Sequence, residues 1–172
     1  CAAYTQVDKA ETEKDLTLMI NAEAPISFAN ALKIVGGKIL QISTDYVFNG
    51  KSNTPYMTHS ERNPINVYGL SKSLAEEGLE RILFKSQQAT ILRTSWLIGP
   101  IGKNFVTTML KLHSEKDLIN VVSDQISAPT FTKDLANICW DIINLKKSEE
   151  STQILHWSDS GVASWYDIAE AI

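Results

Sequence analysis

The chain has 172 residues, of which 44% are hydrophobic and 21% charged, and its formal net charge at pH 7 is -4. These values are ordinary for a soluble globular domain or a large part of one. The acidic balance disfavours a nucleic-acid-binding surface, which is usually basic. No apolar run approaches the roughly 18 residues that cross a bilayer, and no charged-then-apolar leader opens the chain. We therefore expect a cytoplasmic protein without a membrane partner.

Helical and strand patterns alternate along the chain. The predicted helices cover residues 15–35, 67–85, 105–113, 134–145 and 164–172. The predicted strands cover residues 38–43, 90–98 and 118–122. The first helical stretch is expected to break near Pro25 and to end at Gly36, and residues 49–64 are predicted to form a surface loop. Strands that alternate with helices of this length indicate βαβ units, so we predict an α/β fold with a parallel sheet flanked by helices.

The sequence offers no recognisable metal site. Its cysteines, Cys1 and Cys139, fit neither a disulfide framework nor a zinc pattern. The histidines, His59, His113 and His156, are scattered, and we interpret them as loop or solvated residues. We assign no metal ligands, and we predict that Cys139 is a buried free thiol in an apolar helix.

Both ends of the chain have the character of cut ends. It begins at Cys1, without a methionine and directly in an apolar segment. It ends at Ile172, within the first turns of a helix for which Ser164 is the predicted N-cap. We therefore expect a piece of a longer protein.

A tyrosine and a lysine lie four positions apart in one predicted helix, at Tyr68 and Lys72. This spacing places the two side chains one turn apart on the same face. A neighbouring ammonium favours the phenolate and brings a phenol, which normally titrates near pH 10, closer to the range useful for acid/base catalysis. The motif is short, and the alternative is a surface helix that carries both residues by chance.

Two further candidates follow the ends of predicted strands. The first strand ends at Ser43 and Thr44, and open α/β sheets bind ligands outside the carboxyl ends of their strands. A hydroxyl there could hydrogen-bond a carbonyl oxygen that the tyrosine protonates, or it could simply cap the next turn. Trp96, near the end of the second strand, could lie flat against a sugar or wall off a cofactor, or it could pack in the core.

Together these segments resemble the extended short-chain dehydrogenases/reductases, in both order and spacing. The three segments that carry the resemblance are residues 43–48, 64–72 and 93–96. The version found here is similar to the dTDP-4-dehydrorhamnose reductases. Further agreement comes from residues 1–11, 103–106 and 124–130, so the similarity runs over the whole chain.

The resemblance implies NAD(P)H-dependent reduction of the C4 carbonyl of dTDP-4-dehydro-L-rhamnose to dTDP-L-rhamnose, a donor for surface polysaccharide. The cofactor would be NADPH or NADH, the partner a dTDP-sugar, and a homodimer is left open. Residues 1–172 would form a single NAD(P)-binding Rossmann-type domain, truncated at both ends. From about residue 100 onward the chain would contribute part of a smaller substrate-binding lobe.

The resemblance also assigns roles to particular residues. Tyr68 would give a proton to the C4 carbonyl oxygen, which Thr44 would also bind. Lys72 would lower the pKa of Tyr68 and hold the nicotinamide ribose hydroxyls. The residues implied in cofactor binding are Ala2, Ala3 and Tyr4, at the end of a first strand, with Tyr68 and Lys72. The residues implied in substrate binding are Thr44, Asp45, Trp96 and Asn104, the last near the diphosphate.

One departure from the family concerns the glycine-rich G-x-x-G-x-x-G turn, which nothing in this chain matches. We expect that turn, and the residues that choose between NADH and NADPH, to lie upstream of Cys1.

Two other functions stay open. The first is a sister nucleotide-sugar epimerase or dehydratase. A dehydration reaction is disfavoured, because Thr44 is followed by Asp45 and Tyr46 rather than by a paired Asp-Glu. A non-catalytic regulatory subunit, similar to that of methionine adenosyltransferase, shares the Tyr-x-x-x-Lys motif but departs at residues 93–96.

Overall fold

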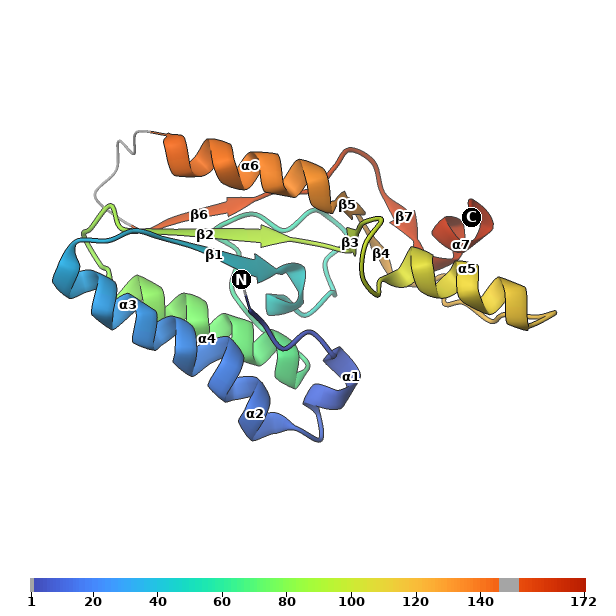
Figure 1. Ribbon diagram of the computed structural model, residues 1–172, viewed down its shortest axis with the longest axis horizontal. Helices are drawn as coiled ribbons and strands as arrows, with labels where there is room; N and C mark the ends of the chain where they lie inside the picture. Colours follow the sequence, from blue (N-terminus) through green and yellow to red (C-terminus); the bar gives the residue numbers. More distant parts are fainter. Residues whose placement is uncertain (1, 146–151) are drawn as a thin grey trace. The chain divides into compact units, whose positions relative to one another are not determined.

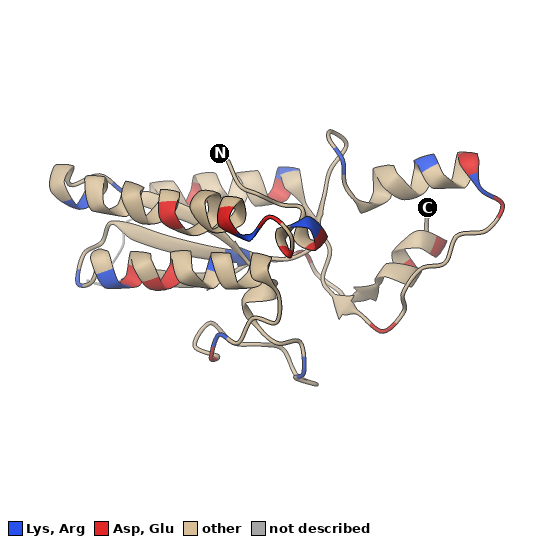
Figure 2. Cartoon of the chain, turned by 90° about the horizontal axis from the view of Figure 1, so that it is seen from below, with Lys and Arg blue, Asp and Glu red and all other residues tan. Residues whose placement is uncertain are grey.

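The computed structural model describes residues 2–145 and 152–172, which form two compact units. The first unit comprises Cys1–Arg93 and Leu145–His156, and the second comprises Thr94–Asn144 and Trp157–Ile172. Cys1, for which we predict no disulfide, lies outside the described residues. Both signs of charge occur along the helices in the view of Figure 2. In the described part of the chain, no helix is both long and apolar enough to cross a membrane.

The first unit is built on a three-stranded sheet with the strand order β1-β2-β6. Its strands are β1 (Ile39–Thr44), β2 (Ala89–Thr94) and β6 (Gln153–His156). β2 and β6 pair in parallel, with Arg93 opposite His156, and all three arrows run the same way in Figure 1. The predicted parallel sheet is confirmed. β6 is a strand that the sequence did not predict, because four residues give too short a pattern to recognise.

One face of this sheet is covered by helices α3 and α4 (Figure 1). The helical elements of this unit are α1 (Val7–Ala10), α2 (Lys14–Leu18), the π-helical turn η1 (Met19–Glu23), α3 (Ala24–Val35) and α4 (Val67–Ile82). The break predicted near Pro25 is a wide turn rather than an interruption, because Pro25 has no N–H to donate to the carbonyl four residues earlier. Gly36, with φ of 73°, ends α3 as predicted.

The core of the first unit lies between these two helices and the sheet. Its central side chains, none more than 1% exposed, are Ala29, Leu79, Leu83, Ala89 and Ile91. The helices approach closely because residue 78 is glycine, and a Cβ there would collide with the side chain of Ile26. This packing fixes α4, which carries Tyr68 and Lys72, against the sheet.

The second unit contains three helices and two small sheets. The helices are α5 (Phe105–Glu115), α6 (Thr132–Asn144) and α7 (Trp165–Glu170). The parallel sheet pairs β3 (Leu97–Ile98) with β5 (Thr130–Phe131), and the antiparallel sheet pairs β4 (Ile126–Ser127) with β7 (Ala163–Ser164). All three helices match predicted ones, and Ser164 caps α7 through its side chain as expected.

Three expectations for the second unit were wrong. Residues 118–122 form no strand: Leu118 is 74% and Val122 50% exposed, so the apolar run faces no core. The Tyr166 N–H donates to the Val122 carbonyl at 3.1 Å, but no strand forms there. The strand predicted over 90–98 ends at Thr94, since Trp96 turns the backbone to a φ of 44° before β3 begins. Cys139 is a free thiol, but its exposure is intermediate because α6 is only partly covered.

Candidate active site

The carboxyl end of β1 places Thr44 against the start of the next turn. Thr44 is 6% exposed and is followed by the 3-10 turn η2 (Asp45–Val47). Its hydroxyl accepts a hydrogen bond from the Tyr46 backbone N–H at 3.2 Å and donates one to Asp45 Oδ1 at 3.1 Å. Thr44 therefore does cap the following turn, which was the simpler interpretation. The same hydroxyl also interacts with the Tyr68 phenol, where it acts to lower the pKa of Tyr68. A hydroxyl has one proton, so Thr44 can donate either to Asp45 or to Tyr68 at any one time.

The start of α4 is held tightly against η2. The Asn66 side chain accepts a hydrogen bond from the Gly69 N–H at 2.7 Å, which caps the helix. Residue 69 must be glycine, because a Cβ there would collide with the backbone carbonyl of Tyr46. The rings of Tyr46 and Tyr68 meet edge to face with centroids 5.8 Å apart. These contacts bring Tyr68 to the carboxyl end of β1.

Tyr68 is a phenol that keeps its proton at neutral pH. Burial raises the pKa of Tyr68 to about 12, the hydrogen bond with Thr44 acts to lower it, and the charges of Asp45 and Tyr46 raise it further. The lowered pKa that the resemblance implied is therefore wrong for this structure, because desolvation of the phenolate outweighs the groups that stabilise it. A protonated phenol is the form that a proton donor requires.

Lys72 is 6% exposed and lies one helical turn beyond Tyr68. Its Nζ donates to the backbone carbonyl of Ile42, within β1, at 3.2 Å. Burial lowers the pKa of Lys72, and the charge of Glu76 opposes that change. An ammonium has three N–H donors, and the Ile42 carbonyl takes one of them. The remaining donors suit the hydroxyls of a ribose, so the donor set fits a nicotinamide nucleotide.

Sequence reasoning missed Glu76, which is a fully buried carboxylate on α4. It accepts hydrogen bonds from Arg93 Nε at 3.0 Å and from Arg93 Nη2 at 2.6 Å, and it also accepts one from the Ser43 hydroxyl. Arg62 reaches it from the more exposed side at 3.2 Å. The available signal was an acidic residue on the buried stripe of a helix, beside Ala75, together with an arginine inside a buried strand.

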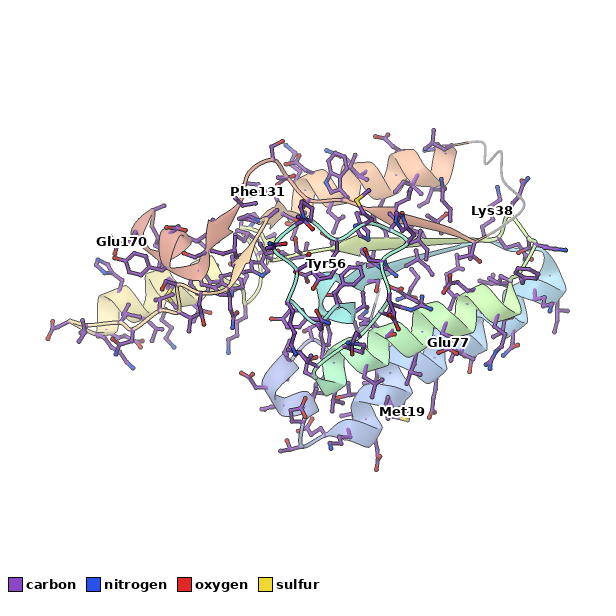
Figure 3. The ribbon with its side chains drawn as sticks, turned by 180° about the vertical axis from the view of Figure 1, so that it is seen from behind. Met19, Lys38, Tyr56, Glu77, Phe131 and Glu170 are labelled. Atoms are coloured by element: carbon purple, nitrogen blue, oxygen red, sulfur yellow. The ribbon has the colours of Figure 1, made fainter. Side chains whose placement is uncertain are left out.

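Arg93 also ties the loop over residues 49–64 to the ends of the strands. Its Nη1 donates to the Thr58 carbonyl at 3.1 Å, and the guanidinium lies 5.0 Å from the centre of the Phe48 ring. The ring of Tyr56, labelled in Figure 3 on this loop, stacks on Phe48 with centroids 4.3 Å apart. The segment has no helix or strand, as predicted, yet aromatic and hydrogen-bonding contacts hold it in place.

Ala2, Ala3 and Tyr4 do not end a strand, since residues 2–6 belong to no helix or strand. Ala2 and Ala3 are exposed, whereas Tyr4 is 8% exposed. Asn21, in the π-helical turn, accepts from the Tyr4 N–H and donates to the Tyr4 carbonyl, both at 2.9 Å. It also donates to the Ser71 hydroxyl at 3.1 Å. Asn21 thereby links the start of the chain to α4, next to Lys72.

Tyr4 also makes a polar contact through its side chain. Its phenol donates to Glu13 Oε2 at 2.6 Å. That hydrogen bond to a carboxylate is the main reason that the pKa of Tyr4 is raised to about 12.

Two further site candidates, Trp96 and Asn104, belong to the second unit. Trp96 is half-buried rather than a fully buried core residue, and its ring stacks on Trp165 with centroids 3.6 Å apart. Asn104 caps α5: its Oδ1 accepts from the Thr107 N–H at 3.2 Å, and its Nδ2 donates to the Gly99 carbonyl at 2.7 Å. Thr44, Asp45, Tyr68 and Lys72 are brought together in the first unit. In the described residues, no cluster of three or more histidine, cysteine or acidic side chains could hold a metal ion.

The sequence profile of the RmlD substrate binding domain family matches residues 1–172. The chain belongs to this family. It is 44% identical over 171 residues to the spore coat polysaccharide biosynthesis protein SpsK of Bacillus subtilis, covering 99% of the chain and 58% of that protein. It is 39% identical to the dTDP-4-dehydrorhamnose reductase of Mycolicibacterium smegmatis, covering 99% of the chain and 51% of that enzyme.

A solved structure shows the same fold. The crystal structure of dTDP-4-dehydrorhamnose reductase from Bacillus anthracis in complex with NADP is 40% identical to the chain, with a TM-score of 0.89. The match covers 99% of the chain and 59% of that enzyme. The chain thus spans between half and three-fifths of the length of these relatives. The predicted family and the predicted Rossmann-type α/β fold are both confirmed.

Proposed function

We propose that the protein containing this chain is an NAD(P)H-dependent reductase of a dTDP-4-keto-6-deoxysugar, with dTDP-4-dehydro-L-rhamnose as substrate and dTDP-L-rhamnose as product. The observation that carries the proposal is the placement of Tyr68 beside Thr44 at the end of β1, with Lys72 one turn along the same helix. Two of the relatives described above are named as reductases of this substrate, and one was crystallised with NADP.

The chemistry assigned to the chain's own residues is proton transfer and positioning. The bound nicotinamide would supply a hydride to C4 of the sugar. Tyr68 would give its phenolic proton to the C4 oxygen, so that the carbonyl becomes a hydroxyl and a phenolate remains. Thr44 would hydrogen-bond the same oxygen, and Lys72 would stabilise the phenolate while its other donors hold ribose hydroxyls.

The remaining contacts are part of the same proposal. Ala2, Ala3 and Tyr4 would run beside the cofactor's ribose and pyrophosphate. Asp45 and Trp96 would contact the deoxysugar. Asn104 would act near the diphosphate through the start of α5, since its own side chain is occupied in the cap.

The larger organisation also remains a proposal. We propose one NAD(P)-binding domain over residues 1–172, whose part from about residue 100 contributes to a substrate lobe. The intact enzyme would be cytoplasmic. The reductase names of the relatives favour this function over an epimerase, a dehydratase or a regulatory subunit.

The test uses the intact protein and dTDP-4-dehydro-L-rhamnose, with oxidation of NADPH or NADH followed by absorbance. Tyr68→Phe should lower kcat by at least about a hundredfold, because it removes a positioned proton donor. Tyr166→Phe, whose ring is 45% exposed in the second unit, is the matched control and should keep normal turnover. Near-normal kcat in Tyr68→Phe would contradict the assignment, and absence of turnover in the unmodified protein would contradict the substrate.

A further inference from the structure

The backbone at Trp96 adopts a conformation that bulky side chains rarely take. Its φ of 44° lies in the left-handed region, between the end of β2 and the start of β3. For a residue with a large side chain this is a steric outlier, which persists only where neighbouring structure fixes it. Such outliers gather at ligand-binding sites, so the groups that hold Trp96 in this conformation bear on function.

Hydrogen bonds hold the chain on both sides of Trp96. The Ser95 hydroxyl donates to the Ala128 carbonyl at 2.6 Å. The Thr130 N–H donates to the Trp96 carbonyl at 3.1 Å, and β3 then pairs with β5 through Leu97 and Thr130. These bonds fix where the side chain of Trp96 leaves the backbone, but they leave its indole ring free to rotate.

The ring itself is held by Trp165, the first residue of α7. The two indoles are nearly parallel, with an interplanar angle of 11° and centroids 3.6 Å apart. Trp165 is in turn packed against the Phe105 ring at 4.4 Å and donates through Nε1 to Gln125 Oε1 at 3.2 Å. Both indoles are nevertheless only half-buried. One face of Trp96 is thus backed by a rigid ring, while part of its surface stays accessible.

We infer that Trp165 is a positioning residue that holds the indole of Trp96 flat for the sugar ring of the nucleotide-sugar substrate. This inference rests on the proposed contact between Trp96 and the deoxysugar. A fixed indole offers a flat apolar surface to the C–H face of a sugar. Because the ring is ordered before the sugar arrives, binding does not have to order it.

The experiment is a double-mutant cycle in the intact protein, reading KM for the nucleotide sugar and kcat. Trp165→Leu should raise KM by about threefold to tenfold, the factor that ordering one free side chain costs on binding, with kcat little changed. Trp96→Leu should raise KM at least as much. If Trp165 acts through Trp96, the double variant should be no worse than Trp96→Leu alone.

Two controls separate positioning from general damage. Trp165→Phe keeps a flat ring, so its KM should lie closer to that of the unmodified protein than the KM of Trp165→Leu. Trp140→Leu removes an indole that is 68% exposed on α6, and it should leave KM unchanged. If Trp165→Leu fails to fold, Trp165→Phe replaces it in the cycle. Its effect on KM is then compared in the protein with Trp96 and in Trp96→Leu.

Several results would overturn the inference. An unchanged KM in Trp165→Leu would do so, as would effects of the two leucine substitutions that simply multiply, or equal losses in Trp165→Phe and Trp165→Leu. An unmodified protein that does not reduce the 4-keto sugar would instead contradict the proposed function. In that case, calorimetric titration with dTDP-rhamnose still tests whether Trp165 acts through Trp96. The four proteins titrated are the unmodified protein, Trp165→Leu, Trp96→Leu and the double variant.

Discussion

Replacing Glu76 by glutamine should destabilise the first unit more than any surface substitution can. Glu76 is fully buried and Arg93 is 3% exposed, and they are joined by three hydrogen bonds, at 3.0, 3.2 and 2.6 Å. Glu76→Gln keeps the shape of the side chain but removes its charge. The guanidinium of Arg93 then stays buried without its Glu76 counter-ion. The new glutamine amide also faces the N–H donors of Arg93 with only one acceptor oxygen.

The expected loss is about 3–5 kcal/mol of unfolding free energy, which is the usual result of removing one partner of a buried ion pair. This is a large share of the roughly 5–15 kcal/mol that holds a domain together. Arg62 provides a matched control, because it contacts the same carboxylate from a side chain that is 24% exposed. Arg62→Gln should cost less, about 1 kcal/mol, because Arg62 is partly exposed and Glu76 keeps Arg93 as its buried counter-ion.

Urea unfolding followed by far-UV circular dichroism measures both losses. The pair Glu76→Leu and Arg93→Met adds a second check, since an apolar replacement of both partners should cost less than the two single substitutions combined. A loss below about 1 kcal/mol for Glu76→Gln, no greater than the loss expected for Arg62→Gln, would refute the view that Glu76 and Arg93 form a buried stabilising pair.

Three further outcomes are expected. Asn21→Ala should cost about 1–3 kcal/mol in urea unfolding, because it leaves the buried N–H and carbonyl of Tyr4 without their side-chain partner; a neutral result would contradict this. Gly69→Ala should lower both stability and kcat, since the new Cβ meets the Tyr46 carbonyl and pushes α4 off the end of β1, and unchanged kinetics would argue against it. The raised pKa of Tyr68, about 12, adds stability that is complete below pH 10 and is lost as pH rises toward 12. The free energy of unfolding, measured from pH 10 to pH 12, should therefore fall less with rising pH in Tyr68→Phe than in the unmodified protein.

Local sequence signals were sufficient to predict β1 and α4, the elements of the first unit that carry Thr44, Tyr68 and Lys72. A run of branched residues predicts β1, and the periodic apolar stripe through Ala75 and Leu79 predicts α4. Gly36 ends α3 in the left-handed conformation that glycine favours. Such features depend on neighbours only a few residues away, so they can be read directly from the sequence.

The features that the sequence did not reveal depend on distant partners. β6 becomes a strand because it pairs with β2, more than fifty residues earlier. Residues 118–122 have a similar apolar pattern but find no such partner. The buried position of Glu76 depends on Arg93, which lies 17 residues away on another element. Hydrophobic pattern alone cannot decide such cases, because it says nothing of which segments meet.

The raised pKa of Tyr68 is compatible with its proposed role as a proton donor. A phenol with a pKa of about 12 is almost wholly protonated at neutral pH, so the donor would be loaded before reduction begins. In the proposed reaction the sugar oxygen would become a strong base only as hydride reaches C4, because an alkoxide is a stronger base than a phenolate. Proton transfer would therefore become favourable at that moment and not earlier.

The phenolate left on Tyr68 would then need stabilising in a site that disfavours charge. The Thr44 hydroxyl acts to lower the pKa of Tyr68, and it would stabilise the phenolate by turning its one proton from Asp45 to the phenolate oxygen. Lys72 lies one turn away on the same helix, its ammonium bonded to the Ile42 carbonyl of the strand that ends in Thr44. Burial alone would hold the proton on Tyr68, whereas in the proposed reaction Thr44 and Lys72 would offset that cost once the proton has left. In this proposal burial and these two groups would act at different stages of one proton transfer, so Thr44, Tyr68 and Lys72 would all be required.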